Sequence, residues 1–517
     1  MTRRPTILRN AAGFLASFSA LTAAIPAIAG SAGAPASLSA AQRANRIGTD
    51  VKSLAALRAW LNAFNTGDRS TMEAFAKSRF APSALEKRPA GARADSDRWM
   101  FMNLGGMDVV SIDAATVTQV KATVRQRLVD GWGHVTIELD PNNPSLILSR
   151  TITFFEPAPA ASGPRVKRTD HFLRRDIDTF AKRLTRQGIF SGVVIIARNG
   201  KPVFARAYGL ARRDAGVQNA TDTRFELASV SKMFTAVAIA QLVEKGRLSY
   251  SDTIIKLLPD YPNKKAAGQI TVEQLVTHTS GLPDYFFSPA YAPEKFHSPR
   301  DYWPAFANDD LRSTPGSQWE YSSSNYVVLG AIIEQLTGGP FRDHIRTNVF
   351  ERAGIPGVSY EGSAASNAAI GYTHFGPGHK PDLTGTARPV PTNRLGGPAG
   401  GGVASAQDLQ HFMEALFDGR LVGRETARAI TTEKVRAEDG GWALGFETHT
   451  WNDVRFVGHN GFFDGAFNQV DAFPMLGYTV AVLSNTDMSG GGAVANRLRI
   501  LLSGSPTPTE VLARRAR

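Results

Sequence analysis

The sequence predicts an α+β protein with two folded domains, the larger built on an antiparallel sheet that is flanked by helices and interrupted by a helical insertion. Three observations carry this prediction. At 517 residues the chain is longer than one hydrophobic core usually serves. Strand-like segments lie in separate groups, one within residues 45–156 and two at the ends of residues 169–505. Residues 157–168 between them are rich in Ala, Pro, Ser and Gly, which is typical of a linker.

Residues 1–29 have the pattern of a secretory signal peptide. Three arginines precede an apolar, alanine-rich stretch over residues 11–28. A small-x-small cleavage site, Ala27-Ile28-Ala29, ends the stretch. The sequence therefore predicts a bacterial periplasmic or secreted protein with no stable membrane span after cleavage. A signal that is retained as a membrane anchor is the alternative.

The composition argues against several kinds of chemistry. The chain has no cysteine, which excludes disulfides, cysteine nucleophiles and thiolate metal sites. The ten histidines are dispersed and no His-Glu-x-x-His motif occurs, so we expect neither a metal nor a cofactor. The net charge of +12 is scattered, without the basic–aromatic stripe that nucleic-acid binding needs, so we expect no nucleic-acid partner.

Residues 45–156 are predicted to form a small α+β domain. Apolar residues at helical spacing predict a helix over 51–64, and a second short helix is expected over 70–77. Strand-like segments follow at 108–112, 116–124, 134–139 and 146–155. This order resembles the cone-shaped nuclear-transport-factor-like (cystatin-like) domains, in which the cone can hold a ligand. An accessory domain without chemistry is the alternative.

Residues 169–505 are predicted to form the larger domain. A helix is expected over 170–187, followed by strands at 191–198 and 201–207 that Asn199-Gly200 joins as a hairpin. The middle of the domain, about 250–400, reads as helices and loops. Three more strands are expected at 454–458, 467–473 and 479–484, before a closing helix over 490–502. The first and last strands would share one antiparallel sheet.

A serine three residues before a lysine stands at the start of an apolar helix, in the stretch Ser229-Val230-Ser231-Lys232. This spacing brings the hydroxyl and the amine to one helix face, about 5–6 Å apart at Cβ. A serine hydroxyl needs an adjacent base to act as a nucleophile. Lysine can be that base if its surroundings lower its pKa toward neutrality. Free backbone N–H groups at the helix start would suit an oxyanion.

Two further clusters follow in the sequence. Tyr321-Ser322-Ser323 precedes the apolar residues 326–330, and His459-Asn460-Gly461 lies near the three C-terminal strands. A phenol, an imidazole on a strand and a glycine that permits close backbone approach all suit acyl transfer. His278 and Ser280 are interpreted as parts of a structural loop, with a separate Ser–His pair as the alternative.

In this order, the three clusters resemble the motifs of serine β-lactamases and penicillin-binding proteins. The resemblance is strongest to the class C β-lactamase and esterase-like group, whose second motif begins with tyrosine. Two intervening segments, 270–282 and 397–409, are also similar to that group. The resemblance covers about residues 170–505 and implies the β-lactamase-like fold.

The resemblance also implies roles for the site residues. Ser229 would attack the acyl carbonyl, and Lys232 would take its proton. Tyr321 would share that proton and relay it, and a cation beside the phenol would favour the phenolate. The backbone N–H groups of Ser229 and Phe462 would form the oxyanion hole. His459, where many relatives have lysine, would orient Tyr321 or contact a substrate carboxylate.

Ser323 departs from the family pattern. The second motif usually ends in asparagine, which binds the substrate amide, and serine is shorter and carries one hydroxyl. Slipping the alignment to use Asn325 conflicts with the apolar residues that follow. This departure favours ester substrates over amides and β-lactams.

The sequence thus predicts an exported serine hydrolase that cleaves an ester or peptide bond of a small molecule through an acyl-serine. A D-amino-acid-specific peptidase or carboxypeptidase, or a β-lactamase acting on a lactam, is the enzymatic alternative. A slowly acylating or non-catalytic binding protein or sensor is the other alternative. The sequence leaves the oligomeric state open.

Overall fold

The computed structural model describes residues 51–155, 165–361, 367–376, 380–390, 395–437 and 440–515, so the expected signal peptide lies outside the described residues. The chain divides into two compact units. Unit 1 takes the chain up to Pro164 together with Gly376–Gly385 and Pro506–Arg517. Unit 2 takes Arg165–Phe375 and Thr386–Ser505.

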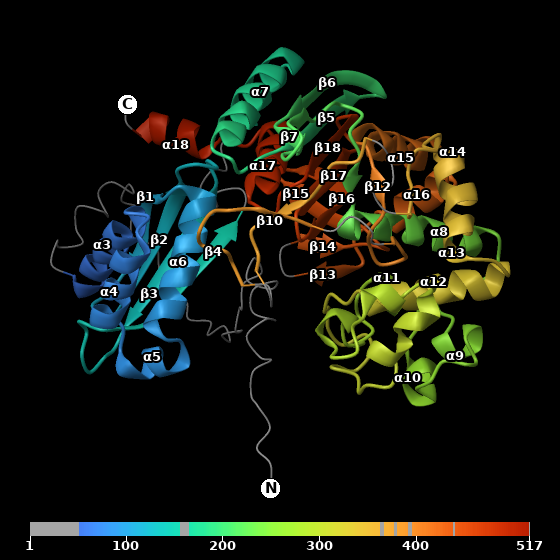
Figure 1. Cartoon of the computed structure of the whole chain (residues 1–517), viewed down its shortest axis with the longest axis horizontal. Coiled ribbons are helices and arrows are strands. Elements are labelled where there is room, and N and C mark those ends of the chain that lie inside the picture. The colour runs from blue at the N-terminus through green and yellow to red at the C-terminus, as the bar shows by residue number, and fades with distance from the viewer. Residues whose placement is uncertain are drawn as a thin grey trace, which may run out of the picture. The chain divides into compact units, whose positions relative to one another are not determined.

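Unit 1 is a four-stranded antiparallel meander with helices, as its sequence pattern predicts (Figure 1). Three of its helices, α5 (Pro82–Lys87), α6 (Ala90–Leu104) and α18 (Pro508–Arg515), were not predicted. The apolar residues of α6 have no amphipathic spacing. Its likeness to nuclear-transport-factor domains remains a prediction. Its elements are α3 (Lys52–Asn65), α4 (Arg69–Arg79), α5 (Pro82–Lys87), α6 (Ala90–Leu104), β1 (Met107–Ala115), β2 (Gln119–Gln126), β3 (Trp132–Leu139), β4 (Ile147–Phe155) and α18 (Pro508–Arg515).

A buried ion pair lies in the core of unit 1. The Arg150 guanidinium of β4 donates two hydrogen bonds of 2.6 Å to the Asp97 carboxylate of α6. The Trp60 indole of α3 donates a third, at 3.2 Å, and the guanidinium lies 4.7 Å from its ring centroid. Both charged side chains are 7% exposed. Their charges are therefore paired and hydrogen-bonded, as buried charges need to be.

Unit 2 is built on an eight-stranded antiparallel sheet with the strand order β13-β14-β15-β16-β17-β18-β5-β6. The predicted hairpin joins β5 and β6, and Asn199 and Gly200 have φ of 49° and 74°, as its tight turn requires. The sheet confirms the predicted pairing of the first and last strands. Its strands are β5 (Gly192–Arg198), β6 (Lys201–Tyr208), β13 (Val435–Ala437), β14 (Gly440–Trp442), β15 (Glu447–Trp451), β16 (Val454–Phe463), β17 (Ala466–Phe473) and β18 (Tyr478–Ser484).

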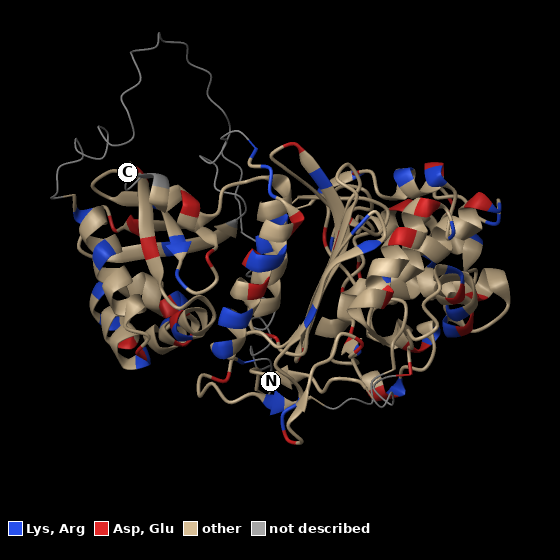
Figure 2. Cartoon of the chain, turned by 90° about the horizontal axis from the view of Figure 1, so that it is seen from above, with Lys and Arg blue, Asp and Glu red and all other residues tan. Residues whose placement is uncertain are grey.

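Helices lie on both sides of this sheet (Figure 2). The terminal helices α7 (Asp170–Arg186) and α17 (Gly490–Ser503) pack on each other, and α15 (Ala406–Asp418) packs on β18 and β5. The helical insertion lies between β6 and β13, as predicted. Its other elements are β7 (Leu210–Arg212), β8 (Val217–Gln218), β9 (Phe225–Glu226), α8 (Lys232–Glu244), α9 (Ile254–Leu257), α10 (Lys264–Gln269), α11 (Val272–Val276), α12 (Ser324–Thr337), α13 (Phe341–Ile345), α14 (Glu351–Ala353), β10 (Tyr372–Thr373), β11 (Arg388–Pro389), β12 (Val403–Ala404) and α16 (Arg424–Ile430).

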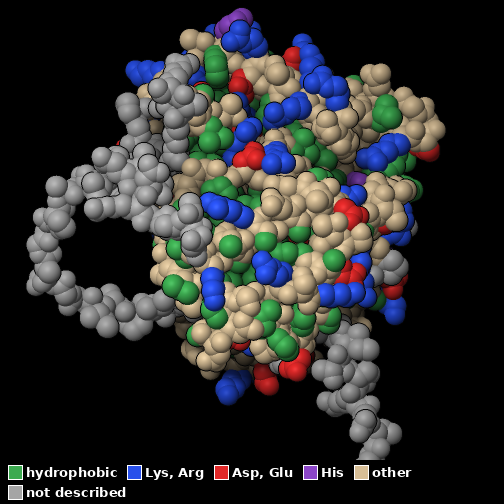
Figure 3. Space-filling model, turned by 90° about the vertical axis from the view of Figure 1, so that its left-hand side faces the viewer, with side chains coloured by type: hydrophobic (Ala, Val, Ile, Leu, Met, Phe, Trp, Pro, Cys, Tyr) green, Lys and Arg blue, Asp and Glu red, His purple; other side chains and the backbone are tan. Residues whose placement is uncertain are grey.

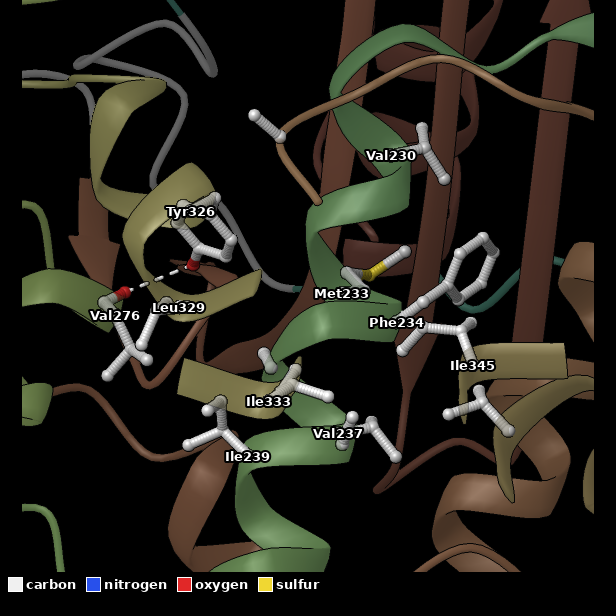
Figure 4. Packing of buried hydrophobic residues seen from close by; sticks show 14 of the residues in the cluster. Val230, Met233, Phe234, Val237, Ile239, Val276, Tyr326, Leu329, Ile333 and Ile345 are labelled. Carbon is white, nitrogen blue, oxygen red and sulfur yellow. Dashed lines mark hydrogen bonds between the residues drawn. The ribbon is translucent and has the colours of Figure 1, made fainter. Parts of the chain in front are cut away.

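Helix α8 runs through the core of unit 2 and is buried on every side from Lys232 to Leu242 (Figure 4). The Phe234 ring meets the rings of Phe350 and Phe412 edge-on, with centroids 5.0 and 4.8 Å apart. Tyr326 of α12 packs near the helix, and its hydroxyl donates to the carbonyl of Val276. Because a helix buried on every side cannot shift without disrupting the core, α8 is a rigid support for the residue that begins it, Lys232.

Charged side chains are spread over both units. Figure 2 shows Lys and Arg interspersed with Asp and Glu along the helices, and on the face in Figure 3 the basic side chains do not gather in one patch. No described helix combines the length and apolar character that crossing a membrane requires. Among the described residues, no three His, Asp or Glu side chains form a possible metal site.

Candidate active site

The Ser-x-x-Lys motif spans a short 3-10 turn, η1 (Ala228–Ser231), and the first residue of α8. Ser229 is half-buried, whereas Lys232 is fully buried. The Lys232 Nζ lies 3.0 Å from the Ser229 Oγ. Ala228, just before the serine, has a φ of 48°, which is strained for a residue with a Cβ. The strained turn presents Ser229 at the start of a rigid helix.

Three oxygen atoms surround the Lys232 amine. Besides the Ser229 Oγ, they are the Ser323 Oγ at 3.4 Å and the carbonyl oxygen of Ala399. Burial lowers the pKa of Lys232 to about 7, although the nearby charge of Asp284 opposes this shift. The amine is therefore balanced between its neutral and charged forms near neutral pH.

The Ala399 carbonyl belongs to a glycine-rich loop that sequence analysis did not connect with Lys232. Gly401 donates its N–H to the carbonyl of Ala228, and the Ser231 hydroxyl donates to the carbonyl of Gly401. The pairing of β12 with β9 fixes the end of this loop. A backbone carbonyl has no residue-specific signal, so only the family resemblance of residues 397–409 pointed to this region.

Tyr321 lies beside the nucleophile, as the motif predicts. Its phenol hydrogen-bonds with the Ser229 side chain, and the Lys232 Nζ lies 5.0 Å from its ring centroid. Burial raises the pKa of Tyr321 far above its usual value. The direction of this shift, to which the charges of Asp284 and Glu447 add, favours a neutral phenol over the phenolate that the resemblance led us to expect. Tyr321 is a neutral phenol at rest.

Strand β16 brings the third motif to the nucleophile turn. A Cβ added to Gly461 would lie 2.2 Å from the carbonyl oxygen of Leu227, so only glycine permits this close approach. Gly461 shares a strand face with His459, and Phe462 pairs with Phe467 of β17. The strand and the turn that carry the two expected oxyanion N–H groups are thus neighbours.

His459 is fully buried and does not meet Tyr321 directly. Its ring lies edge-on to Trp442, with centroids 5.4 Å apart, and Trp442 lies 5.8 Å from Tyr321. Burial lowers the pKa of His459, with Glu447 opposing the shift. Its Nδ1 bonds with the carbonyl of Asn460. His459 is therefore a neutral imidazole whose contact with Tyr321 runs through the Trp442 ring.

Ser323 lies inside the site, next to a carboxylate that sequence analysis missed. The Ser323 backbone N–H donates to the Asp284 Oδ2 at 2.9 Å, and burial raises the pKa of Asp284. Asn325 instead accepts a hydrogen bond from the Ser280 hydroxyl, and its amide nitrogen lies 3.1 Å from the His278 Nδ1. This geometry agrees with the sequence register in which Ser323, rather than Asn325, holds the third position of the motif.

The chain belongs to the β-lactamase family of serine hydrolases. The sequence model of the Beta-lactamase family matches residues 177–504. The putative penicillin-binding protein PbpX of Bacillus subtilis (strain 168) is 30% identical over 318 residues, covering 61% of this chain and 75% of that protein.

Solved structures of other proteins share the fold. The penicillin-binding protein from Bacillus halodurans has a TM-score of 0.56 at 26% identity, covering 65% of this chain and all of that one. The D-amino acid amidase from Ochrobactrum anthropi SV3 has a TM-score of 0.53 at 21% identity, covering 64% of this chain and 98% of that one. The predicted β-lactamase-like architecture is confirmed.

Proposed function

We propose that this chain is an exported serine hydrolase that cleaves an ester or peptide-type amide bond through an acyl-Ser229 intermediate. The observation that carries the proposal is the 3.0 Å approach of a lysine amine, whose pKa is about 7, to the Ser229 hydroxyl. A neutral amine has two N–H groups and one lone pair. The Ala399 carbonyl and the Ser323 hydroxyl can accept the two N–H groups, which leaves the lone pair for the Ser229 proton.

In the proposed acylation step, Ser229 Oγ bonds to the acyl carbon while Lys232 takes the hydroxyl proton. The Ser229 and Phe462 N–H groups stabilise the oxyanion, and each such donor is typically worth about 10²–10³ in rate. As the tetrahedral intermediate collapses, the bond to the leaving group breaks and Tyr321 gives its proton to that group. Lys232 then returns the proton that it took from Ser229 to Tyr321. In deacylation, water attacks the ester, its proton goes to the Lys232–Tyr321 pair, and Ser229 leaves with its hydroxyl restored.

Esters are the proposed preferred substrates. Ser323 stands where an asparagine amide would bind a substrate amide, and its hydroxyl is 3.4 Å from the Lys232 Nζ and 2% exposed. A substrate amide N–H and carbonyl would therefore lose a partner that an ester does not need. Amide hydrolysis is the second candidate, because the chain shares its fold with a D-amino acid amidase.

Comparing three substrates tests this order. Purified protein is assayed with p-nitrophenyl acetate, a D-Ala-D-Ala peptide and nitrocefin, and Ser229→Ala is the control. We expect kcat/KM to be highest for the ester and to vanish in the control. Faster turnover of nitrocefin or of the peptide would overturn the preference for esters. Residual activity of Ser229→Ala would overturn the acyl-serine mechanism.

Two further experiments address export and the sensor alternative. The N-terminal sequence of protein recovered from a bacterial periplasm should begin at Gly30, just after the proposed cleavage site, and an intact N-terminus would support a retained anchor.

Labelling tests the sensor alternative, and a fluorophosphonate should label Ser229. An acyl adduct that forms but does not turn over would favour a slowly acylating sensor.

A further inference from the structure

His278 forms hydrogen bonds with the residues that directly precede and follow Tyr321, the proposed proton relay. The Glu320 N–H donates to the His278 carbonyl at 2.9 Å, and the Ser322 N–H donates to the His278 Nδ1 at 3.1 Å. Between these two bonds the imidazole stacks on the Tyr321 ring, with centroids 4.3 Å apart and planes 26° apart. One residue therefore fixes the neighbours of Tyr321 and one face of its phenol.

These contacts require a neutral His278 with its proton on Nε2, because the Nδ1 must accept the Ser322 N–H. The ring is fully buried, and burial lowers its pKa well below the usual value, with the charge of Lys232 adding to the effect. Protonation would break the bond to Ser322 and bring a second cation toward Lys232. The imidazole can therefore serve as a constant acceptor throughout turnover.

The backbone at His278 is strained, which is a separate sign of a functional constraint. Its φ is 56°, in the left-handed region that non-glycine residues seldom adopt. It follows the end of α11, where its N–H donates to Leu275. Strain of this kind persists only where the surroundings enforce it, and it gathers at active sites. Here it turns both the carbonyl and the ring of His278 toward the Tyr321 segment.

We propose that His278 is a positioning residue that holds the Tyr321 phenol against Ser229, through the Ser322 N–H bond and the ring stack together. This inference rests on the proposed function, since it gives Tyr321 a role in proton transfer. A misplacement of about 1 Å in a catalytic group can cost about 100-fold in rate. Loss of His278 should therefore lower kcat while substrate binding stays nearly unchanged.

Two substitutions of His278 distinguish its hydrogen bond with Ser322 from its stacking on Tyr321, and a substitution of His344 is the control. His278→Ala removes both the acceptor and the stack. His278→Asn keeps an oxygen acceptor near the position of Nδ1 and tolerates the left-handed φ. His344→Ala is matched, because the His344 Nδ1 lies 3.3 Å from the side-chain amide nitrogen of Asn348, as the His278 Nδ1 lies 3.1 Å from that of Asn325, and none of the described contacts of His344 involves Tyr321.

The assay divides the rate of p-nitrophenyl acetate turnover by the concentration of Ser229 that a fluorophosphonate can label. This normalisation keeps unfolded protein out of the value of kcat. We expect His278→Ala to lose 30- to 100-fold in kcat with KM within about twofold, and His278→Asn to recover about tenfold of that loss. His344→Ala should match the wild type. Unchanged kcat per labelled site in His278→Ala would overturn the inference, as would a lack of recovery in His278→Asn.

The outcomes separate this inference from the proposed function. If wild-type Ser229 neither labels nor turns over, the proposed function fails. If it does both and His278→Ala is as active as the wild type, only the positioning role fails. Nitrogen-15 NMR gives an independent readout, in which His278 should be neutral with Nδ1 unprotonated. A protonated Nδ1 would rule out the bond from Ser322.

Discussion

The pH dependence of activity reports directly on Lys232. Only the neutral amine can take the Ser229 proton, and burial lowers the pKa of Lys232 to about 7. Below that pH the neutral fraction falls tenfold per pH unit, so kcat/KM at pH 5 should be about one hundredth of its value on the alkaline plateau. Without burial the same limb would lie near the ordinary lysine value of about 10.4.

The assay is kcat/KM for p-nitrophenyl acetate from pH 5 to pH 9, corrected for spontaneous hydrolysis. We expect one acid limb with a midpoint near 7. Replacing His459 with Gln should leave this limb in place, because burial lowers the pKa of His459 and so moves its titration away from the limb, toward lower pH. A flat profile, or a limb that disappears in His459→Gln, would refute the assignment of Lys232 as the base.

Three further predictions follow from contacts in the two units. Asp284→Asn should move the acid limb to lower pH, because the carboxylate charge raises the pKa of Lys232, and an unmoved limb in the same kinetic assay would contradict this. Gly461→Ala should lower kcat/KM at least 100-fold, because its Cβ would lie 2.2 Å from the Leu227 carbonyl, whereas Gly268→Ala on α10 meets no atom within 4 Å and should stay active. Asp97→Ala should destabilise unit 1 by about 3–5 kcal/mol in urea unfolding, because it leaves a buried guanidinium unpaired, and a change below about 1 kcal/mol would contradict that account.

The parts of the fold that could be predicted are those in which local chemistry dictates the structure. Asn199-Gly200 encodes its own tight turn, and the short apolar, β-branched run of β18 favours a strand. Helix α6 was missed because its apolar residues have no helical period. Strands β13 and β14 were missed because they are three residues each and depend on sheet neighbours distant in sequence for their pairing.

The candidate site divides in the same way. Side chains with distinctive chemistry, Ser229, Lys232 and Tyr321, could be identified from their spacing and order. The partners that set their pKa values could not. The Ala399 carbonyl has no sequence signal, and Asp284 is an ordinary loop aspartate until the fold buries it near Lys232. Burial itself, which keeps Tyr321 a neutral phenol, is a property of the assembled core.

Trapping the covalent intermediate tests the central claim most directly. Wild-type protein is mixed with p-nitrophenyl acetate, quenched in acid within one turnover and digested with a protease. The masses of the peptides are then measured by mass spectrometry. The account predicts one acetyl group on the peptide that contains Ser229, formed more slowly at pH 5 than at pH 8. An acetyl group on another residue, or hydrolysis without any adduct in the first turnover at either pH, would contradict it.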